Sequence, residues 1–380
     1  MRLFSIFICG LLLTLYNCGG EVQIGDPNPA PQIVEPIALV VTNDGGFKVA
    51  SFAWIDLGTR QPFVTEEVLS TSSGDILARV HNQTVYFLHR CDNVITIIDF
   101  DNIAEPTQWS YPKTGSCAPD LVDLVFTSGG KAYASYFASS PQESLAIIDL
   151  ETGDRTGFID LSSVVDPKDT DGRPEADQMS VVGNKLFLTL QELDISDLPK
   201  PVRPGKIVVI DTLSDTIETV IELQGMNPFN ELIYDSTTDR IYVSEVGVWG
   251  VLDGGIEIIN PDTLESEGFW VTEEDLGGDL TDFAVVSSSK GYALIQDMNL
   301  NTKVVPFSDS AAQAPILEVR SGEGNYLSVI ELNSLGELYV GDRSVRHAGV
   351  WVINTVDDTF LTDEPIDVGL LPVDIVFVEP

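Results

Sequence analysis

Short runs of hydrophobic residues follow one another along the chain from Ile37 onward, and Gly, Asn, Asp and Pro separate them. Most runs are only a few residues long and rich in Val, Ile, Tyr and Phe, which favours strands. The spacing of three and four residues that marks an amphipathic helix is missing almost everywhere. The pattern therefore predicts an all-β chain.

One element recurs about every 50 residues, a period typical of repeat architectures. It is a β-branched run that ends in Ile-Asp or Ile-Asn, where the polar residue can start a turn. In the sixth unit a degenerate run, Val304-Val305-Pro306-Phe307, takes its place. The recurring pairs are Ile55-Asp56, Ile98-Asp99, Ile148-Asp149, Ile210-Asp211, Ile259-Asn260 and Ile353-Asn354.

A second marker has the same period and is an aromatic residue inside a short apolar triplet. It appears at Tyr86, Tyr133, Phe187, Tyr242, Tyr292 and Tyr339. Two independent markers with one period indicate a repeated unit of four short strands, which is typical of a propeller blade. We count seven units.

The two ends of this region complement each other. The segment 37–42 reads as the second strand of a blade, whereas the segment 373–378 reads as a lone first strand. Pairing of the two would remove the open edge that a linear array leaves. The sequence therefore predicts one domain over residues 37–380, a seven-bladed β-propeller closed by pairing of the N- and C-terminal strands in one blade.

The repeated units resemble the YVTN-type seven-bladed β-propellers of bacterial surface and periplasmic proteins. The matching residues are Tyr242-Val243-Ser244-Glu245, Tyr339-Val340-Gly341-Asp342 and the Ile-Asp-x-x-Thr turns. The resemblance implies the fold but leaves the function open, because these residues are structural. Some members of this group are outer-membrane lipoproteins that capture a cofactor such as cobalamin beside a transporter.

The amino terminus has the organisation of an export signal. Met1-Arg2 precedes an apolar run of about a dozen residues, too short to span a bilayer of roughly 30 Å. The following Leu15-Tyr16-Asn17-Cys18 resembles a bacterial lipobox, although Asn17 departs from the small residue usual before the cysteine. We therefore expect residues 1–17 to be a signal peptide and Cys18 to carry lipid; the alternative is a plain secretory signal with an incidental cysteine.

Residues 18–36 are rich in Gly, Pro, Asn and Gln and read as an extended tether. Gly20 stands where an Asp would favour retention in the inner membrane. We therefore expect an exported protein, lipid-anchored to the bacterial outer membrane on its periplasmic or cell-surface side.

Charge changes the choice of partners. Lys and Arg total 20 against 59 Asp and Glu, a formal charge of −39. Nucleic-acid binding needs a cationic surface and is largely ruled out. The acidity suits either a saline habitat or a cationic partner.

Two cysteines remain in the predicted domain, Cys91 and Cys117. An even pair in an oxidising compartment predicts a disulfide, with two buried thiols as the alternative. In the propeller, the two cysteines fall in the two loops of the second blade on one face. Ligand sites of propellers usually lie on that face.

Polar residues stand at the entrance to nearly every innermost strand, so we expect carboxylates and amides to gather at one channel mouth. These polar groups could bind a cation or a polyhydroxylated ligand; the alternative is that they cap turns or face water. Trp249 and Tyr326 could stack on a planar ligand; the alternative is that they are packing residues. The candidate ligand-binding residues are Asp120, Asp123, Glu175, Asp177, Asn230, Asp279, Asp282, Asp374, Trp249 and Tyr326.

One acidic loop resembles a calcium loop, with Asp169, Asp171 and Glu175 as candidate metal ligands. It departs from the EF-hand pattern at Pro167 and Gln178, so a hydrophilic turn is the alternative. The cofactor is unknown, with calcium as a possibility to test.

Catalytic motifs are scarce, since no G-x-S-x-G elbow or H-E-x-x-H pair is present. The leading hypothesis is a monomeric, non-enzymatic, membrane-anchored propeller that binds a small ligand, a cation or an outer-membrane protein at the channel mouth. The alternative is a calcium-dependent lactonase-like hydrolase that uses channel carboxylates. A third class, a quinone-dependent dehydrogenase, would need a bound chromophore.

Overall fold

The computed structural model describes residues 36–65, 69, 73–99, 106–166, 171–194, 200–201, 203–309, 311–322 and 324–379. The signal, Cys18 and most of the tether lie outside this part. Within it, no helix has the length and hydrophobicity that a membrane span requires.

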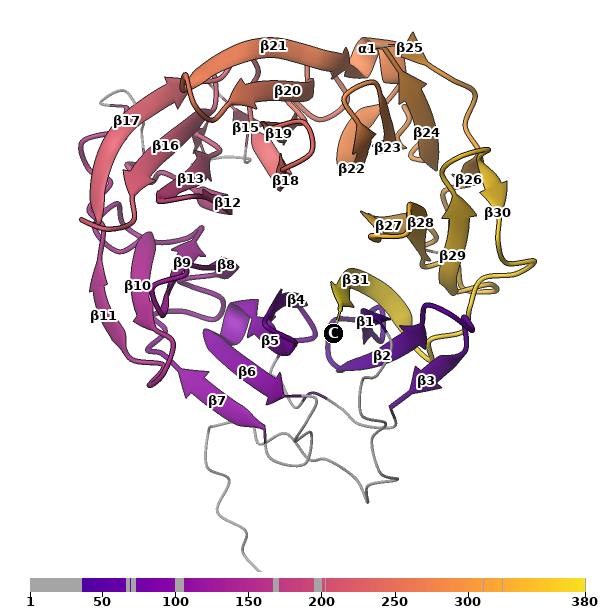
Figure 1. Cartoon of the computed structure of the whole chain (residues 1–380), viewed down its shortest axis with the longest axis horizontal. Helices are drawn as coiled ribbons and strands as arrows, with labels where there is room; N and C mark the ends of the chain where they lie inside the picture. The colour runs from indigo at the N-terminus through magenta and orange to yellow at the C-terminus, as the bar shows by residue number, and fades with distance from the viewer. Residues whose placement is uncertain are drawn as a thin grey trace, which may run out of the picture.

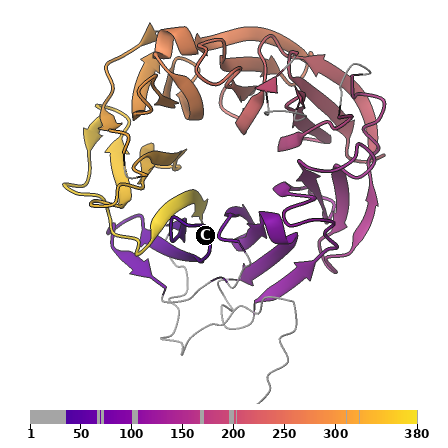
Figure 2. The ribbon, with the colours of Figure 1, turned by 180° about the vertical axis from the view of Figure 1, so that it is seen from behind.

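Seven antiparallel sheets stand around a central axis (Figure 1), which confirms the predicted seven-bladed propeller. Seen from behind, the ring is equally continuous (Figure 2). In each blade the first strand is innermost and the fourth is outermost, although blade 6 has two short outer strands.

The strands of each blade run in order from the innermost to the outermost. Blade 1 contains β31 (Leu371–Val378), β1 (Ile37–Asn43), β2 (Ala50–Asp56) and β3 (Pro62–Val64); blade 2 contains β4 (Ile76–His81), β5 (Thr84–His89), β6 (Val94–Asp99) and β7 (Thr107–Ser110); blade 3 contains β8 (Leu121–Phe126), β9 (Lys131–Tyr136), β10 (Leu145–Asp149) and β11 (Arg155–Phe158); blade 4 contains β12 (Ala176–Val182), β13 (Lys185–Leu190), β16 (Lys206–Asp211) and β17 (Thr216–Glu222). Blade 5 contains β18 (Pro228–Asp235), β19 (Arg240–Glu245), β20 (Gly255–Asn260) and β21 (Glu265–Thr272); blade 6 contains β22 (Asp279–Ser287), β23 (Lys290–Gln296), β24 (Thr302–Ser308), β25 (Ala311–Ala312) and β26 (Leu317–Val319); blade 7 contains β27 (Leu327–Leu332), β28 (Glu337–Asp342), β29 (Gly349–Asn354) and β30 (Thr359–Phe360).

Blade 1 is built from both ends of the domain, as predicted. Strand β31 pairs antiparallel with β1, from Ile37 opposite Val378 to Asn43 opposite Leu371. A register shift lies between Val41 and Thr42. The ladder therefore leaves β1 without an open edge.

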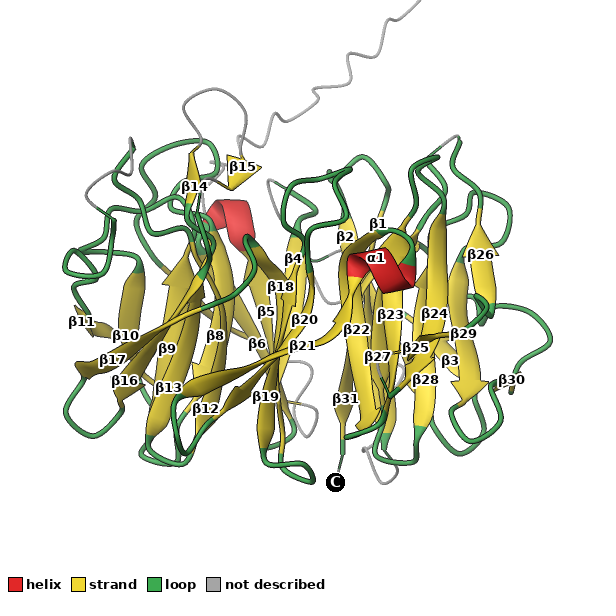
Figure 3. Cartoon of the chain, turned by 90° about the horizontal axis from the view of Figure 1, so that it is seen from above, coloured by secondary structure: helices red, strands yellow, loops and turns green. Residues whose placement is uncertain are grey.

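The loops fall on two faces, which Figure 3 shows from the side. The mouth face carries the loops that enter the innermost strands and those between second and third strands; the opposite face is the far face. The mouth face also holds the hairpin of β14 (Leu193–Asp194) and β15 (Lys200–Pro201), the 3-10 helix η1 (Arg90–Asp92) and the single α-helical turn α1 (Glu273–Leu276). The chain enters β1 at the far face, where β31 also ends.

The core lies between the blades. Second strands such as β5, with the sequence Thr-Val-Tyr-Phe-Leu-His, are buried on both sides because each blade is covered by two neighbours. The recurring aromatic residues all lie in this layer, at most 7% exposed. Outermost strands such as β17 alternate between exposed and half-buried residues.

A repeated polar contact joins blades at the far face. The Lys131 ammonium and the Tyr133 hydroxyl in blade 3 both donate to the Asp215 carboxylate in blade 4. Lys290 and Tyr292 in blade 6 do the same to Asp358 in blade 7. In blades 3 and 6, the aromatic residue therefore carries a polar link to the next blade besides its apolar packing.

Candidate functional site

Three predicted ligand residues form the same contacts along the channel. The Asp123 carboxylate accepts hydrogen bonds from the backbone N–H of Leu124, at 2.8 Å, and from that of Met179 in the next blade, also at 2.8 Å. Register shifts place Asp123 and Asp282 at corresponding irregular points of their strands. The Asp282 carboxylate likewise accepts the N–H of Phe283, at 2.7 Å, and that of Ile330 in the next blade, at 2.8 Å. The Asp374 carboxylate accepts the N–H of Ile375, at 3.0 Å, and that of Ala78 in the next blade, at 2.7 Å.

These contacts make Asp123, Asp282 and Asp374 links between blades. Each carboxylate has both oxygens engaged by buried backbone donors, and each residue is at most 8% exposed. Without them, those N–H groups would lose their partners in a dry environment. A ligand-binding role for the three acids stays a prediction.

One cation stands among the channel acids. The Arg79 Nε lies 2.6 Å from the Asp123 carboxylate, and its terminal nitrogen lies 3.8 Å from that of Asp374. Glu231 and Glu331 interact electrostatically with the same guanidinium. One arginine therefore faces a larger number of acidic side chains.

Three of these acids, Asp282, Glu231 and Glu331, have raised pKa values. Burial raises the pKa of Asp282 to about 8. Burial and the neighbouring charge of Asp282 raise the pKa values of Glu231 and Glu331 well above the usual range. Several of these groups are consequently protonated at neutral pH.

A cavity of about 300 Å³ opens on the mouth face, and blades 2 to 5 line it. We call it the mouth pocket. Four of the predicted residues lie in its wall, Asp120, Asp177, Asn230 and Trp249. The complete lining is Leu77, Arg90, Asp120, Val122, Phe137, Asp177, Gln178, Gln191, Leu193, Asn227, Phe229, Asn230 and Trp249.

Asp177 forms the buried floor of this pocket on the blade 4 side. Its two oxygens accept hydrogen bonds from Gln191, at 2.5 Å, and from Gln178, at 3.1 Å. Burial raises its pKa to about 6, although both amides oppose the shift. Asp177 thus changes charge close to neutral pH.

The part of the lining from blades 2 and 3 combines an arginine and an acid. The Arg90 guanidinium lies 3.5 Å from the Asp75 carboxylate and 3.6 Å from that of Asp120. Burial raises the pKa of Asp120. Cys91 and Cys117 are paired in a disulfide, as predicted, and bridge the loops that carry these two side chains.

Blade 5 supplies amides and aromatic rings. The buried Asn227 donates through Nδ2 to the Gly247 carbonyl, at 3.3 Å, while its Oδ1 has no hydrogen-bond partner among the described residues. Asn230 donates to the Thr281 carbonyl, at 3.1 Å. Phe229 and Trp249 meet edge to face, with their ring centres 5.7 Å apart, and Trp249 is 46% exposed.

Buried acids hold the loop that carries Trp249. Both oxygens of Asp279 accept the Gly250 N–H, at 3.0 and 2.9 Å. Glu273 accepts the N–H groups of Gly254, at 2.9 Å, and Leu280, at 2.6 Å, and burial raises its pKa to about 8. Asp279 therefore positions a pocket residue without lining the pocket itself.

Tyr326 lies away from the pocket, at the junction of blades 7 and 1. Its ring centre is 5.2 Å from the Arg343 guanidinium, which is 2% exposed. Arg343 donates to the Pro372 carbonyl, at 2.9 Å, and to Asn43 Oδ1, at 2.8 Å, so it joins both strands of the ring closure.

The predicted calcium loop is only partly described, since Asp169 lies outside the described residues. Asp171 accepts the Arg173 N–H, at 2.9 Å, and the fully buried Glu175 accepts the Leu193 N–H, at 3.1 Å. Neither belongs to a group of three potential metal ligands in the described part of the chain. The group found there is Cys91, Cys117 and Asp120, whose two sulfurs are bonded to each other.

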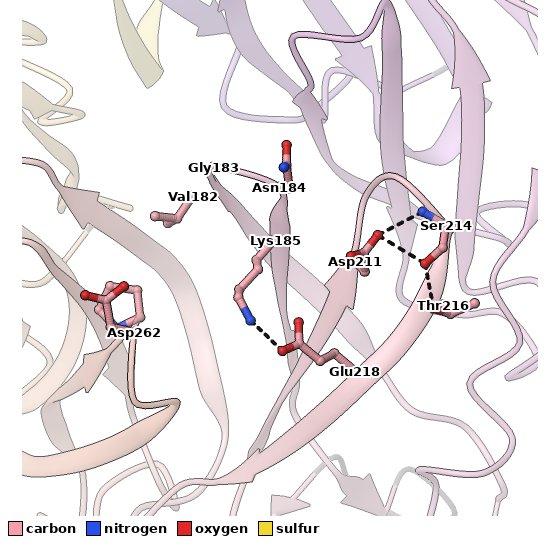
Figure 4. A pocket seen from close by; sticks show the side chains of 10 residues that line it. Val182, Gly183, Asn184, Lys185, Asp211, Ser214, Thr216, Glu218 and Asp262 are labelled. Atoms are coloured by element: carbon pink, nitrogen blue, oxygen red, sulfur yellow. Dashed lines mark hydrogen bonds and ion pairs between the residues drawn. The ribbon is translucent and has the colours of Figure 1, made fainter.

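A second cavity, of about 660 Å³, lies on the far face between blades 4 and 5 (Figure 4). The Lys185 ammonium pairs with Glu218 at 2.6 Å, and the Asp211 carboxylate accepts from its own turn, including the Ser214 N–H at 2.8 Å. These polar groups are engaged with one another, which makes the groove a weaker candidate than the mouth pocket.

Sequence reasoning missed Arg90, Gln178, Gln191 and Asn227 as pocket residues. Arg90 directly precedes the predicted disulfide residue Cys91, and Gln178 directly follows the predicted Asp177. Including the immediate neighbours of each predicted residue would have found both. Asn227 lies three residues before the predicted Asn230, and Gln191 has no comparable signal.

No family model and no curated protein sequence matches the chain. Solved structures match in fold. They include a putative 6-phosphogluconolactonase from Bacteroides fragilis, at a TM-score of 0.61 and 12% identity over 93% of this chain and 100% of that one. A putative 6-phosphogluconolactonase from Bacteroides uniformis matches at 0.61 and 13% over 90% and 99%. Dihydro-heme d1 dehydrogenase NirN in complex with DHE matches at 0.55 and 14% over 89% and 74%.

These structures support the seven-bladed fold, and their differing functions leave the activity of this chain open. Membership of the YVTN group in particular has no family model behind it.

Proposed function

We propose that this protein is a binding module that holds a small organic cation, bearing N–H donors and an apolar body, in the mouth pocket. The observation that carries the proposal is Asn227 Oδ1, a buried acceptor in the pocket wall that has no donor among the described residues. A buried polar atom without a partner is costly, so a ligand that donates to it gains affinity.

The charge of the pocket favours a cation over an anion. Asp120 and Asp177 line it together with one arginine, Arg90, which is shared with Asp75. An ammonium group could donate a charge-assisted hydrogen bond to the carboxylate of either pocket acid. The chain's net charge of −39 also steers cations toward its surface.

The aromatic residues fit the same class of ligand. Phe229 and the half-exposed Trp249 present apolar surface at the pocket rim. Indole rings attract organic cations through their faces, by about 0.5–2 kcal/mol. A ligand with an amine at one end and an apolar body would use both walls.

A calcium-dependent hydrolase is less well supported. It would need channel carboxylates that are free to hold a divalent ion, whereas Asp123, Asp282 and Asp374 each bond two backbone N–H groups. Among the described residues, the pocket lining also contains no serine, cysteine or histidine side chain that could act as a nucleophile or base.

The location belongs to the proposal as well. Export, lipidation of Cys18 and attachment to the outer membrane rest on the sequence of residues 1–36. In that setting the module would present its ligand to solvent or to an outer-membrane partner. Labelled palmitate should enter the wild-type protein and be lost in Cys18→Ala.

Calorimetric titration with tyramine, an aromatic amine, tests the binding proposal against p-cresol, which lacks the amine. Tyramine should bind at least about tenfold more tightly, since a charge-assisted hydrogen bond contributes about 1.5–3 kcal/mol. Asp120→Asn and Trp249→Ala should each weaken tyramine binding several-fold.

Two variants on the mouth-face loop between β1 and β2 serve as matched controls. Asp44→Asn removes one exposed carboxylate, and Phe47→Ala removes an aromatic ring that is 43% exposed. Both should bind tyramine as the wild type does. The proposal would be overturned if p-cresol bound as tightly as tyramine, or if the control variants lost as much tyramine affinity as the pocket variants. Binding of the neutral sugar trehalose without binding of tyramine would also overturn it.

A further inference from the structure

A third cavity, of about 370 Å³, lies between blades 6 and 7 and shares no residue with the mouth pocket. We call it the blade 6–7 cleft. Its walls come from β26 and the residue after it, from the loop that enters β27, from the loop between β28 and β29, and from β29 itself. The residues that matter below are Leu317, Val319, Arg320, Arg346, His347 and Trp351.

Two arginines from different blades face this cleft without a counter-ion. Arg320 and Arg346 are exposed, and neither forms an ion pair in the described part of the chain. Most other described lysines and arginines are paired with a carboxylate. In a chain with 59 acidic residues, two unpaired guanidinium groups in one cavity are unusual.

One of the two carboxylates in the cleft, that of Asp342, is already occupied. One oxygen of Asp342 accepts the Ser344 hydroxyl, at 2.5 Å, and the Ser344 N–H, at 2.8 Å. Its other oxygen accepts Trp351 Nε1, at 3.1 Å. Glu318 also lines the cleft but pairs with neither arginine among the described residues.

The cleft is held in shape by its own contacts. Asn325 Oδ1 accepts the Val345 N–H, at 2.9 Å, and the His347 N–H donates to the Ser344 carbonyl, at 3.0 Å. Trp351 packs edge to face on Phe360, with ring centres 5.1 Å apart. The loop that carries Arg346 and His347 is thus tied to the segment that enters β27 and closed by a turn of its own.

We infer that the blade 6–7 cleft binds an organic oxyanion with an apolar body. The carboxylate or phosphate group lies between Arg320 and Arg346, which offer planar, bidentate donors suited to both. The ring nitrogens of His347 add a further donor. The apolar body packs on Leu317, Val319 and Trp351. The site takes the opposite charge class from the mouth pocket and does not depend on the proposed function.

Calorimetric titration with 2-naphthoate, 2-naphthyl phosphate and inorganic phosphate tests the inference and separates the two headgroups. At least one naphthyl anion should bind at least about tenfold more tightly than both inorganic phosphate and the uncharged 2-naphthamide. Arg320→Gln/Arg346→Gln should weaken that anion at least about tenfold while leaving the melting temperature unchanged.

The matched control is Lys48→Gln/Lys200→Gln, which removes the same charge from two cations that have no ion pair among the described residues. It separates a local site from long-range attraction and should bind as the wild type does. The inference would be overturned if both double variants lost the same anion affinity, or if 2-naphthamide bound as tightly as the naphthyl anions. The absence of anion binding at millimolar concentration would also overturn it. Tyramine binding should be unaffected by the arginine variants.

Discussion

The two halves of the mouth face use the same kinds of residue differently. In blades 2 to 5, Asp120, Asp177 and Asn227 border a cavity. In blades 6, 7 and 1, Asp279 and Asp374 accept backbone N–H groups, and Arg343 joins the strands of the ring closure. We call these the pocket half and the seam half.

The difference shows that a position in the repeat does not decide the role of a polar side chain. Asp123 stands in the pocket half, yet it links blades as Asp282 and Asp374 do. The two acids differ in their partners. The Asp123 carboxylate accepts two backbone N–H groups, whereas Asp120 Oδ1 accepts no hydrogen bond and has only the Arg90 side chain nearby. The pocket half contains acceptors without a hydrogen-bond donor, Asp120 Oδ1 and Asn227 Oδ1, beside satisfied ones such as Asp123. In the seam half, both oxygens of Asp282 and of Asp374 are satisfied.

The largest effect should follow from breaking the seam itself. Removal of residues 371–380 takes away β31, including the fully buried Ile375 and Val378, and exposes the edge of β1. The loss should exceed about 5 kcal/mol, enough to abolish a cooperative melting transition. Removal of residues 379–380 alone should change little. A truncated chain that melts as the wild type does would contradict ring closure as a stabilising feature.

Loss of the disulfide should loosen the pocket half. Cys91→Ser/Cys117→Ser opens a loop with a sequence separation of 26 residues and should lower the free energy of unfolding by about 3 kcal/mol. Tyramine should also bind more weakly, because Arg90 and Asp120 are no longer held together. Denaturant titration measures the first effect; a reducing agent should reproduce it in the wild type and do nothing to the variant.

A single acid in the seam half should matter more for stability than one in the pocket half. Asp282→Ala leaves the N–H groups of Phe283 and Ile330 without acceptors and should cost about 2–3 kcal/mol. Asp120→Asn should cost less than about 0.5 kcal/mol. Asp282→Asn keeps an acceptor oxygen and should fall between them. The comparison fails if Asp120→Asn proves the more damaging.

A further expected effect is a decline in stability as pH rises. Burial raises the pKa values of Asp282 and Glu273 to about 8, above those of the unfolded chain near 4. The folded state therefore binds more protons between about pH 4 and 8, and the free energy of unfolding falls across that window. We expect thermal melts to show a lower melting temperature at pH 8 than at pH 5. Asp282→Asn should flatten the slope, and a rise in melting temperature over this range would contradict the assignment.

The fold was predictable because its signals are periodic. The Ile-Asp runs and the aromatic residues recur in every blade or nearly so, and the final strand matches the missing member of blade 1. The disulfide followed from cysteine count and loop position. Each of these features depends on spacing along the chain, which a sequence displays directly.

The site was harder because it depends on which hydrogen bonds are left unmade. Nothing in the sequence separates Asp120 from Asp123, since the strand irregularity that aims Asp123 at Met179 is a property of pairing. Tyr326 was predicted as a stacking residue but lies beside Arg343, a partner 17 positions away in sequence. The importance of Asn227 depends on its contacts in the fold: Nδ2 donates to the Gly247 carbonyl, and Oδ1 has no hydrogen-bond partner among the described residues.

The position at which the chain enters the ring has a mechanical consequence. Strand β1 begins at the far face and is paired along both edges, with β2 and with β31, from Ile37 to Asn43. Antiparallel hydrogen bonds run across the strands, so a pull between the chain before Ile37 and an object held on the mouth face acts along β1 and shears both ladders at once. The two terminal strands would thus share the load over their whole length, whereas separating Ile37 from its neighbour Val378 would open the same ladder one pair at a time.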